Sequence, residues 1–163
     1  MRKAVALAAG LLILLVVNQG IYGRERLLTD GRVVFLELSP VDPRSLMQGD
    51  YMRLNFALAD RVFPGERTQL ADGHLVVAVD RRGVGQFRRR ADATPLAPNE
   101  IALRYRVRSG QARFATNAFF FEEGQAKTFE NARFGEFRVG PDGEMILTGL
   151  RGPGLEPLRG AAK

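Results

Sequence analysis

The chain contains no cysteine and no tryptophan, and its one histidine is His74. Without cysteine, neither a disulfide framework nor a thiolate zinc site can form. A single imidazole excludes the metal and catalytic sites that use two or more histidines. Serine is also scarce, since it occurs only at positions 39, 45 and 109. The chain therefore has few of the side chains that enzymes commonly use in catalysis.

The rest of the composition is that of a folded protein. Hydrophobic residues make up 45% and charged residues 26% of the 163 positions, whereas an intrinsically disordered chain has few apolar residues. The 24 basic side chains outnumber the 18 acidic ones, which gives a formal net charge of +6. The length is close to the commonest size of a single domain. We therefore expect one folded domain.

The amino-terminal segment predicts a helix that crosses a membrane. Arg2 and Lys3 are followed by residues 4–23, none of which is charged. As a helix this segment would be about 30 Å long, enough to span the apolar core of a bilayer. Its most apolar part, residues 4–17, is also typical of a removable signal peptide, but no pair of small residues marks a cleavage site after it. We therefore predict that residues 1–23 form an uncleaved signal-anchor that lies in the lipid bilayer.

The basic residues before this segment also predict an orientation. Short basic amino-terminal tails usually stay in the cytoplasm. The prediction is thus a protein that passes once through the cytoplasmic membrane. Residues 24–163 would then lie outside the cytoplasm, in the periplasm or its equivalent.

The rest of the chain predicts β-strands. From residue 33 onward apolar and polar residues alternate with a period of two, as in half-buried strands. The candidate strands cover residues 33–38, 51–58, 75–79, 84–89, 101–108, 113–121, 135–139 and 145–150. Residues 33–38 and 75–79 are almost continuously apolar, which indicates strands buried on both faces. Connections that contain glycine, such as Ser109-Gly110 and Pro141-Asp142-Gly143, favour hairpins.

These strands predict the architecture. We expect residues 24–152 to form one mainly β domain, either a β-sandwich or a partly open antiparallel barrel. One short helix is expected over residues 123–133, because two acidic side chains open this segment and an arginine closes it. The glycines and prolines that follow residue 152 predict a flexible tail over residues 153–163.

The most specific motif of the chain is Gly49-Asp50-Tyr51-Met52-Arg53-Leu54-Asn55-Phe56. The pattern Gly49-Asp50-Tyr51-x-x-Leu54-x-Phe56 resembles the signature of the GDYXXLXY family, except that Phe56 stands where the signature has tyrosine. Residues 24–28, 40–46 and 119–124 are similar to other segments of that family. The resemblance implies a membrane-associated protein of the bacterial inner membrane, in a family without an assigned activity. It also implies a polytopic membrane protein as a neighbour.

Part of this motif has a structural explanation. Alternation along residues 51–58 places Leu54 and Phe56 on the face that packs against the core. Gly49 would supply the positive φ of a turn before the strand. Asp50 would stabilise that turn by accepting hydrogen bonds from backbone N–H groups.

Two residues of the motif lie on the opposite face of the predicted strand. Tyr51 and Arg53 do not need to face the core, so they are the candidates for a binding surface. A tyrosine beside an arginine is typical of protein interfaces. The simpler interpretation is a turn followed by the start of a strand, with no binding role.

The sequence offers little support for catalysis or metal binding. Leu46, Gly49 and Asp50 resemble part of the box around the serine of a membrane signal peptidase, but Val41 stands at the nucleophile's position. Ser45 would have only His74 as its base. The aspartates show no spacing typical of a calcium site. The sequence therefore favours a protein that is not an enzyme and uses no cofactor or metal.

Arginines on one predicted strand suggest a second binding surface. Arg104, Arg106 and Arg108 stand at alternate positions and share one face. Such a face suits anionic lipid headgroups or an acidic partner, although it is also compatible with an ordinary solvated surface. No aromatic platform for stacking bases accompanies these arginines, so we expect no nucleic-acid partner.

Together these features predict a membrane-anchored accessory or interaction module outside the cytoplasm that serves a neighbouring membrane protein. The alternative is a small-ligand-binding or hydrolase domain that uses the polar residues around Asp50, Tyr51 and Arg53.

Overall fold

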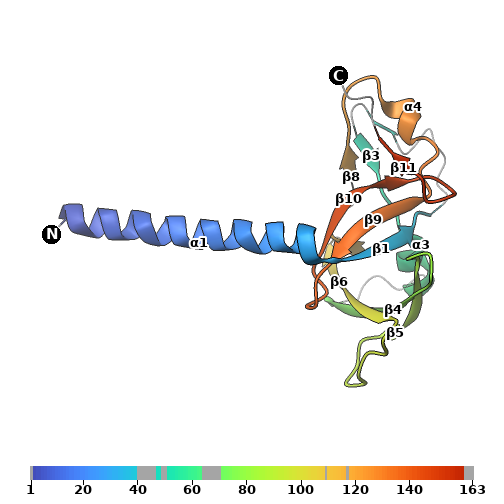
Figure 1. Ribbon diagram of the computed structural model, residues 1–163, viewed down its shortest axis with the longest axis horizontal. Coiled ribbons are helices and arrows are strands. Elements are labelled where there is room, and N and C mark those ends of the chain that lie inside the picture. Colours follow the sequence, from blue (N-terminus) through green and yellow to red (C-terminus); the bar gives the residue numbers. More distant parts are fainter. Residues whose placement is uncertain are drawn as a thin grey trace.

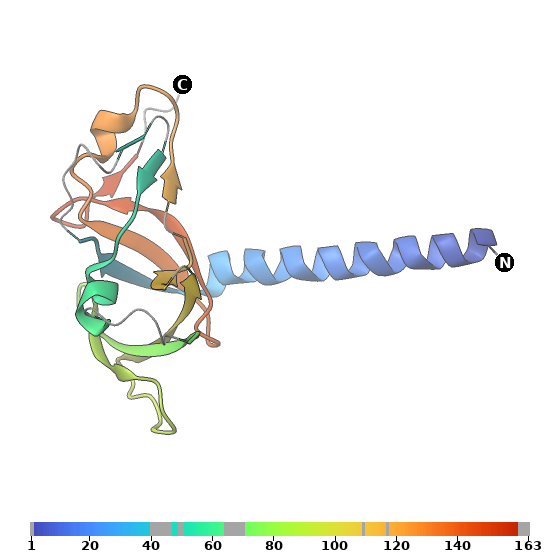
Figure 2. The same ribbon diagram turned by 180° about the vertical axis from the view of Figure 1, so that it is seen from behind.

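The computed structural model describes residues 2–39, 47–48, 51–63, 71–108, 110–116 and 118–159. These residues form one long helix and a β-domain (Figures 1 and 2). The predicted mainly β fold with one amino-terminal apolar helix is confirmed. Ser45, Gly49 and Asp50 lie outside the described residues.

Helix α1 (Arg2–Asp30) projects away from the β-domain (Figure 1). Its apolar side chains are exposed, as Leu11 at 62% and Leu15 at 61% illustrate. The stretch Leu7–Asp30 is long and apolar enough to cross a membrane. A helix without a polar face has no favourable surface toward water, so it needs an apolar environment. The helix continues to Asp30, past the boundary expected at residue 23.

In the part of the β-domain that the structure describes, the strands form three antiparallel sheets. The first consists of β1 (Arg32–Glu37), β9 (Phe134–Val139), β10 (Met145–Arg151) and β11 (Pro157–Leu158), in that order. The second has the order β5 (Gly85–Arg90), β4 (Gly73–Val79), β6 (Glu100–Arg108) and β7 (Gln111–Phe114). The third is small and contains β2 (Met47–Gln48), β3 (Tyr51–Arg53) and β8 (Ala118–Phe120).

Isolated bridges join these sheets into one curled structure. Phe35 of β1 pairs with Val84 beside β5, and Leu38 pairs with Phe56 beyond β3. The ring of Phe56 packs edge-on against those of Phe114, at 6.2 Å between centroids, and Phe137, at 5.4 Å. Strands of different sheets therefore enclose one apolar core.

The hairpins expected from the glycine turns are present. Strands β9 and β10 pair with Val139 opposite Met145, around a turn in which Gly143 has a φ of +80°. Strands β6 and β7 pair with Arg108 opposite Gln111, and Gly110 in their turn has a φ of +69°. Both turns therefore use the left-handed conformation that glycine adopts without a steric penalty.

Buried strands follow the predicted pattern in one case and depart from it in the other. Residues 75–79 of β4 are all buried, as a strand covered on both faces should be. Along β1, by contrast, Val34 and Leu36 are buried while Glu37 is exposed and Phe35 is half-buried. The side chains of Phe35 and Glu37 therefore lie on a face of β1 that is only partly covered.

Two predicted strands are shorter than expected. The strand over residues 51–58 ends after Arg53, and α3 (Ala57–Val62) begins where the alternation continues. The prediction of one continuous strand over residues 51–58, with no helix in it, was therefore wrong. The strand over residues 113–121 is divided into β7 and β8 near Ala115, whose φ is +47°.

Two predictions near the carboxyl end also change. The helix expected over residues 123–133 is reduced to one turn, α4 (Ala126–Phe129), preceded by Gly124 with a φ of +82°. Within the segment expected to be a flexible tail, β11 pairs with β10, with Leu158 opposite Leu150. This part of the chain is therefore held against the first sheet.

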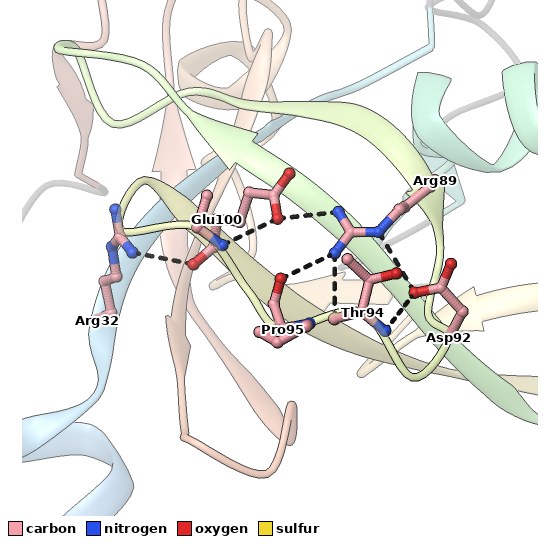
Figure 3. A network of polar contacts seen from close by, with 7 residues as sticks. Arg32, Arg89, Asp92, Thr94, Pro95 and Glu100 are labelled. Carbon is pink, nitrogen blue, oxygen red and sulfur yellow. Dashed lines mark hydrogen bonds and ion pairs between the residues drawn. The ribbon is translucent and has the colours of Figure 1, made fainter.

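A network of polar contacts holds the loop between β5 and β6 (Figure 3). The guanidinium of Arg89 donates to Oε2 of Glu100 at 2.9 Å, and its other terminal nitrogen reaches the carbonyl oxygens of Thr94 and Pro95 at 3.4 Å. Arg32 at the start of β1 reaches the carbonyl oxygen of Glu100 at 3.4 Å. The loop thus closes around one arginine side chain.

The same contacts shift the pKa values of the two loop carboxyls. Hydrogen bonds from Arg89 and from the backbone N–H of Ala97 lower the pKa of Glu100. The backbone N–H of Thr94 is the main cause of the lowered pKa of Asp92. Both carboxylates are stabilised in the charged form, because hydrogen bonds to that form are lost on protonation.

Candidate functional site

The small sheet carries the two motif residues that were singled out for binding. Tyr51 is half-buried and Arg53 is exposed, whereas Met52 between them is 2% exposed. Leu54 and Phe56 are also buried, at 2% and 4%. Along the motif, buried side chains thus alternate with half-buried or exposed ones.

An aromatic pair, with one ring exposed and the other half-buried, lies on the outer side of this sheet. Tyr51 pairs with Phe120 in the register of β3 and β8, and their ring centroids are 5.8 Å apart. Phe120 is 74% exposed, the largest value for any large hydrophobic side chain in the described part of the β-domain. We call Tyr51, Arg53 and Phe120 the aromatic surface. The hydration of an apolar ring is unfavourable, so a surface of this kind favours contact with another apolar group.

A polar cleft of about 380 Å³ adjoins the aromatic surface, and we call it the Arg53 cleft. Its polar lining comes from β3, α3 and β7 and from the residues that adjoin them: Arg53, Asn55, Asp60, Gln111, Arg113 and Thr116. Asp60 at the cleft accepts a hydrogen bond of 2.5 Å from the hydroxyl of Ser39. These groups suit the binding of a small polar molecule, but they do not include a nucleophile beside a base.

The candidate hydrolase residues do not form a site in the described part of the chain. His74 was expected in a solvated turn, but it is half-buried on β4, with Nε2 3.2 Å from the carbonyl oxygen of Asp142. Ser45 and Asp50 lie outside the described residues. Within those residues, no group of three acidic or histidine side chains could hold a metal ion. The pKa shifts of Glu100 and Asp92 belong to the β5–β6 loop.

The three arginines of β6 are partly paired with acidic side chains. Arg104 and Arg106 both donate to Oε1 of Glu144, the latter at 3.0 Å. Arg108 lies 3.9 Å from Asp72. The three arginine side chains remain 40–60% exposed. One carboxylate thus serves two arginines, so the positive charge of this face exceeds the negative charge.

Two further arginines lie beside these three, and sequence reasoning missed both. A hollow of about 370 Å³ is lined by Arg24 of α1 and Arg113 of β7 together with Arg104, Arg106 and Arg108. We call it the arginine hollow. The turn at Ser109-Gly110 could have revealed Arg113, because the hairpin register places it opposite Arg106. Nothing in the local sequence places Arg24 there.

The comparisons with known proteins give one match. A family model described as GDYXXLXY protein matches residues 13–150. No curated protein and no solved structure shows significant similarity to the chain.

Proposed function

The chain belongs to the GDYXXLXY family, and on this premise we propose that it is a membrane-anchored interaction module that binds a neighbouring membrane protein outside the cytoplasm. In this proposal α1 is an uncleaved signal-anchor, and the β-domain lies in the periplasm or its equivalent. The aromatic surface contacts the partner.

The anchor is supported by the exposure and length of α1. The stretch Leu7–Asp30 is long and apolar enough to span a bilayer, and its most apolar part is not buried against the β-domain. Arg2 and Lys3 precede it, so the weak excess of positive charge favours a cytoplasmic amino end. In intact cells, protease added outside the cytoplasmic membrane should digest the β-domain, and alkaline carbonate should leave the chain in the membrane. A mature chain that begins near residue 20 would contradict the anchor.

The observation that carries the binding proposal is the exposed ring of Phe120, which packs on the half-buried Tyr51 beside the exposed Arg53. Tyrosine and arginine are enriched among the few residues that dominate the affinity of protein interfaces. The surface lies on the small sheet, at the end of the domain that carries α4 (Figures 1 and 2). It therefore extends away from the strands that meet α1.

The test compares two double variants of the full chain. Tyr51→Ala with Arg53→Ala removes the centre of the aromatic surface. Phe87→Ala with Arg88→Ala removes the same kinds of side chain from exposed positions on β5. Crosslinking of native membranes followed by mass spectrometry identifies the partner of the wild-type chain.

We expect the first variant to fold but to lose co-purification with that partner by about tenfold or more, the effect of losing about 1.4 kcal/mol. The control should bind within about twofold of the wild-type chain. Unchanged co-purification of a folded first variant would remove the aromatic surface from consideration. Loss of folding in that variant would instead assign Tyr51 a structural role.

The second candidate is a small-ligand-binding domain that uses the Arg53 cleft. The observation in its favour is the set of polar side chains that line this cleft of about 380 Å³. Gln111→Ala changes the cleft without touching the aromatic surface, because Gln111 is an exposed residue of β7. A partner complex that survives in this variant while a bound small molecule is lost would favour the second candidate.

A further inference from the structure

We propose that the arginine hollow binds the phosphate group of an anionic membrane lipid. This inference rests on the membrane anchor of the proposed function and is independent of the aromatic surface. Five arginines line the hollow, and Glu144 is the one acidic side chain in its described lining.

The position of Arg24 places the hollow at the level of lipid headgroups. Arg24 directly follows the uncharged residues 4–23. If that segment fills the apolar core of the bilayer, Arg24 lies at the interface. The other arginines line the same hollow from β6 and β7. Figure 1 shows that α1 meets the domain beside β6 and the β9–β10 end of the first sheet.

The charges in the hollow are not balanced by the described residues. Glu144 is shared between Arg104 and Arg106. Neither Arg24 nor Arg113 has an ion pair with a described carboxylate. Arg106 and Arg113 are also directly opposite each other in the β6–β7 register, an arrangement in which like charges destabilise a sheet. A bound anion would remove this repulsion.

The side chains that line the hollow carry the kind of donor groups that suit a phosphate. A guanidinium group presents several N–H donors in one plane and binds phosphate oxygens through two of them at once. Arg104, Arg106 and Arg108 project from alternate positions of one strand, and Arg113 comes from its neighbour. An anionic headgroup could therefore accept hydrogen bonds from two strands.

A neighbouring groove favours a lipid over a soluble phosphate. This groove of about 810 Å³ runs between α1 and β10, and it shares Arg24, Arg106, Glu144 and Met145 with the arginine hollow. On α1 it reaches Gly20 and Gln19, which belong to the uncharged segment. A lipid with its phosphate in the hollow could thus place its glycerol and the start of an acyl chain along the helix. A free phosphate would leave this groove empty.

The test is native mass spectrometry of the full chain in detergent, titrated with phosphatidylglycerol or with phosphatidylcholine of the same acyl chains. Phosphatidylglycerol carries a net negative charge, whereas the choline group of the other lipid would meet the arginines with a positive charge. We expect phosphatidylglycerol to bind the wild-type chain at least about fivefold more tightly.

The variant Arg106→Gln with Arg113→Gln should lower the affinity for phosphatidylglycerol roughly tenfold or more, since each basic group near a membrane surface contributes about a fivefold effect. The control, Arg81→Gln with Arg82→Gln, loses the same charge at exposed positions outside the hollow. It should change the affinity less than about twofold. Arg24→Gln provides a second variant, because Arg24 is an exposed residue of α1 and does not belong to the buried core.

Three results would overturn the inference. These are equal affinity for the two lipids, wild-type affinity in both the double variant and Arg24→Gln, and displacement of phosphatidylglycerol by an equal concentration of inorganic phosphate. The last result would assign the hollow to a soluble anion. Extraction with alkaline carbonate measures the anchor separately. A failed anchor therefore gives a soluble chain, whereas a failed lipid site gives a membrane-bound chain without lipid preference.

Discussion

Replacement of Leu54 by alanine tests whether the apolar part of the motif is structural. Leu54 is 2% exposed and belongs to the central apolar cluster. Its neighbour Asn55 is exposed, although the carbonyl oxygen of Asn55 accepts a hydrogen bond from the backbone N–H of Ser39. We expect Leu54→Ala to destabilise the fold and Asn55→Ala, which keeps that carbonyl, to have little effect.

The expected magnitude follows from the atoms removed and from what surrounds them. Leucine loses three carbon atoms, at about 0.8 kcal/mol each, so the transfer contribution is about 2.4 kcal/mol. An empty cavity in a rigid core would bring the total to as much as about 5 kcal/mol. Leu54, however, lines both the Arg53 cleft and a second cleft of about 250 Å³ on its other side. Because the space left by the leucine side chain would open into these clefts, it would not be a closed cavity in a rigid core. We therefore expect Leu54→Ala to lower the free energy of unfolding by about 2.5–3.5 kcal/mol.

The measurement is denaturant unfolding of the full chain in detergent, with the slope of the transition compared among variants. Asn55→Ala should stay within about 0.5 kcal/mol of the wild-type chain. If the two variants exchange their effects, the chain is displaced by one residue and the opposite face is buried. Equal, small effects would show that this segment does not belong to the cooperative core.

Two further predictions concern the motif's last position and the β5–β6 loop. Phe56→Tyr, which restores the family's residue, should cost less than about 1 kcal/mol, because Phe56 lines the Arg53 cleft and the added hydroxyl can reach its polar groups; a loss above about 2 kcal/mol would place the hydroxyl among apolar side chains. Because the pKa values of Glu100 and Asp92 are lowered from 4.5 and 3.8, their contribution to stability is present above those values and is lost as the pH falls through the lowered values. Thermal unfolding between about pH 5 and about pH 3 should therefore show a smaller loss of stability in Glu100→Gln than in the wild-type chain, and equal losses would contradict a role for Glu100.

Sequence patterns predicted the strands best where burial alone decides the structure. Residues 75–79 are buried as their continuous apolar run predicts. The alternate residues of the motif are buried because a period of two reports which face meets the core. The alternation misled at Leu58, which is buried but belongs to α3. Helix α3 has no side-chain hydrogen bond at its first residue, so the sequence contains no start signal for it.

Backbone conformations that depend on distant contacts were not predictable. Ala115 adopts a positive φ and separates β7 from β8, although alanine gives no local reason for it. The helix expected over residues 123–133 shortens to one turn, and Phe129 at its end and Ala132 beyond it are both buried.

The surface residues show the same contrast between features that neighbouring residues predict and features that depend on residues far apart in the sequence. Alternation placed Arg104, Arg106 and Arg108 on one face, and they share the arginine hollow. Their acidic partner Glu144 comes from the β9–β10 hairpin. Pairing across that sequence distance depends on the order of the strands, which a single sequence does not specify. Phe120 was likewise recognised only as part of a predicted strand, because its exposure depends on the pairing of β8 with β3.

The junction between α1 and the β-domain fixes the angular position of the domain around the helix axis. Gly31 alone separates Asp30 of the helix from Arg32 of β1, and its carbonyl oxygen accepts a hydrogen bond from Arg138 at 3.1 Å. A side chain at Gly31 would collide with the carbonyl oxygen of Leu27, at 2.3 Å. Because the connection is this short, each residue inserted into the helix after Arg24 would rotate the domain by about 100° about the helix axis. It would also move the domain by about 1.5 Å along that axis. The number of residues between Arg24 and Gly31 thus determines which direction, parallel to the membrane plane, the aromatic surface faces.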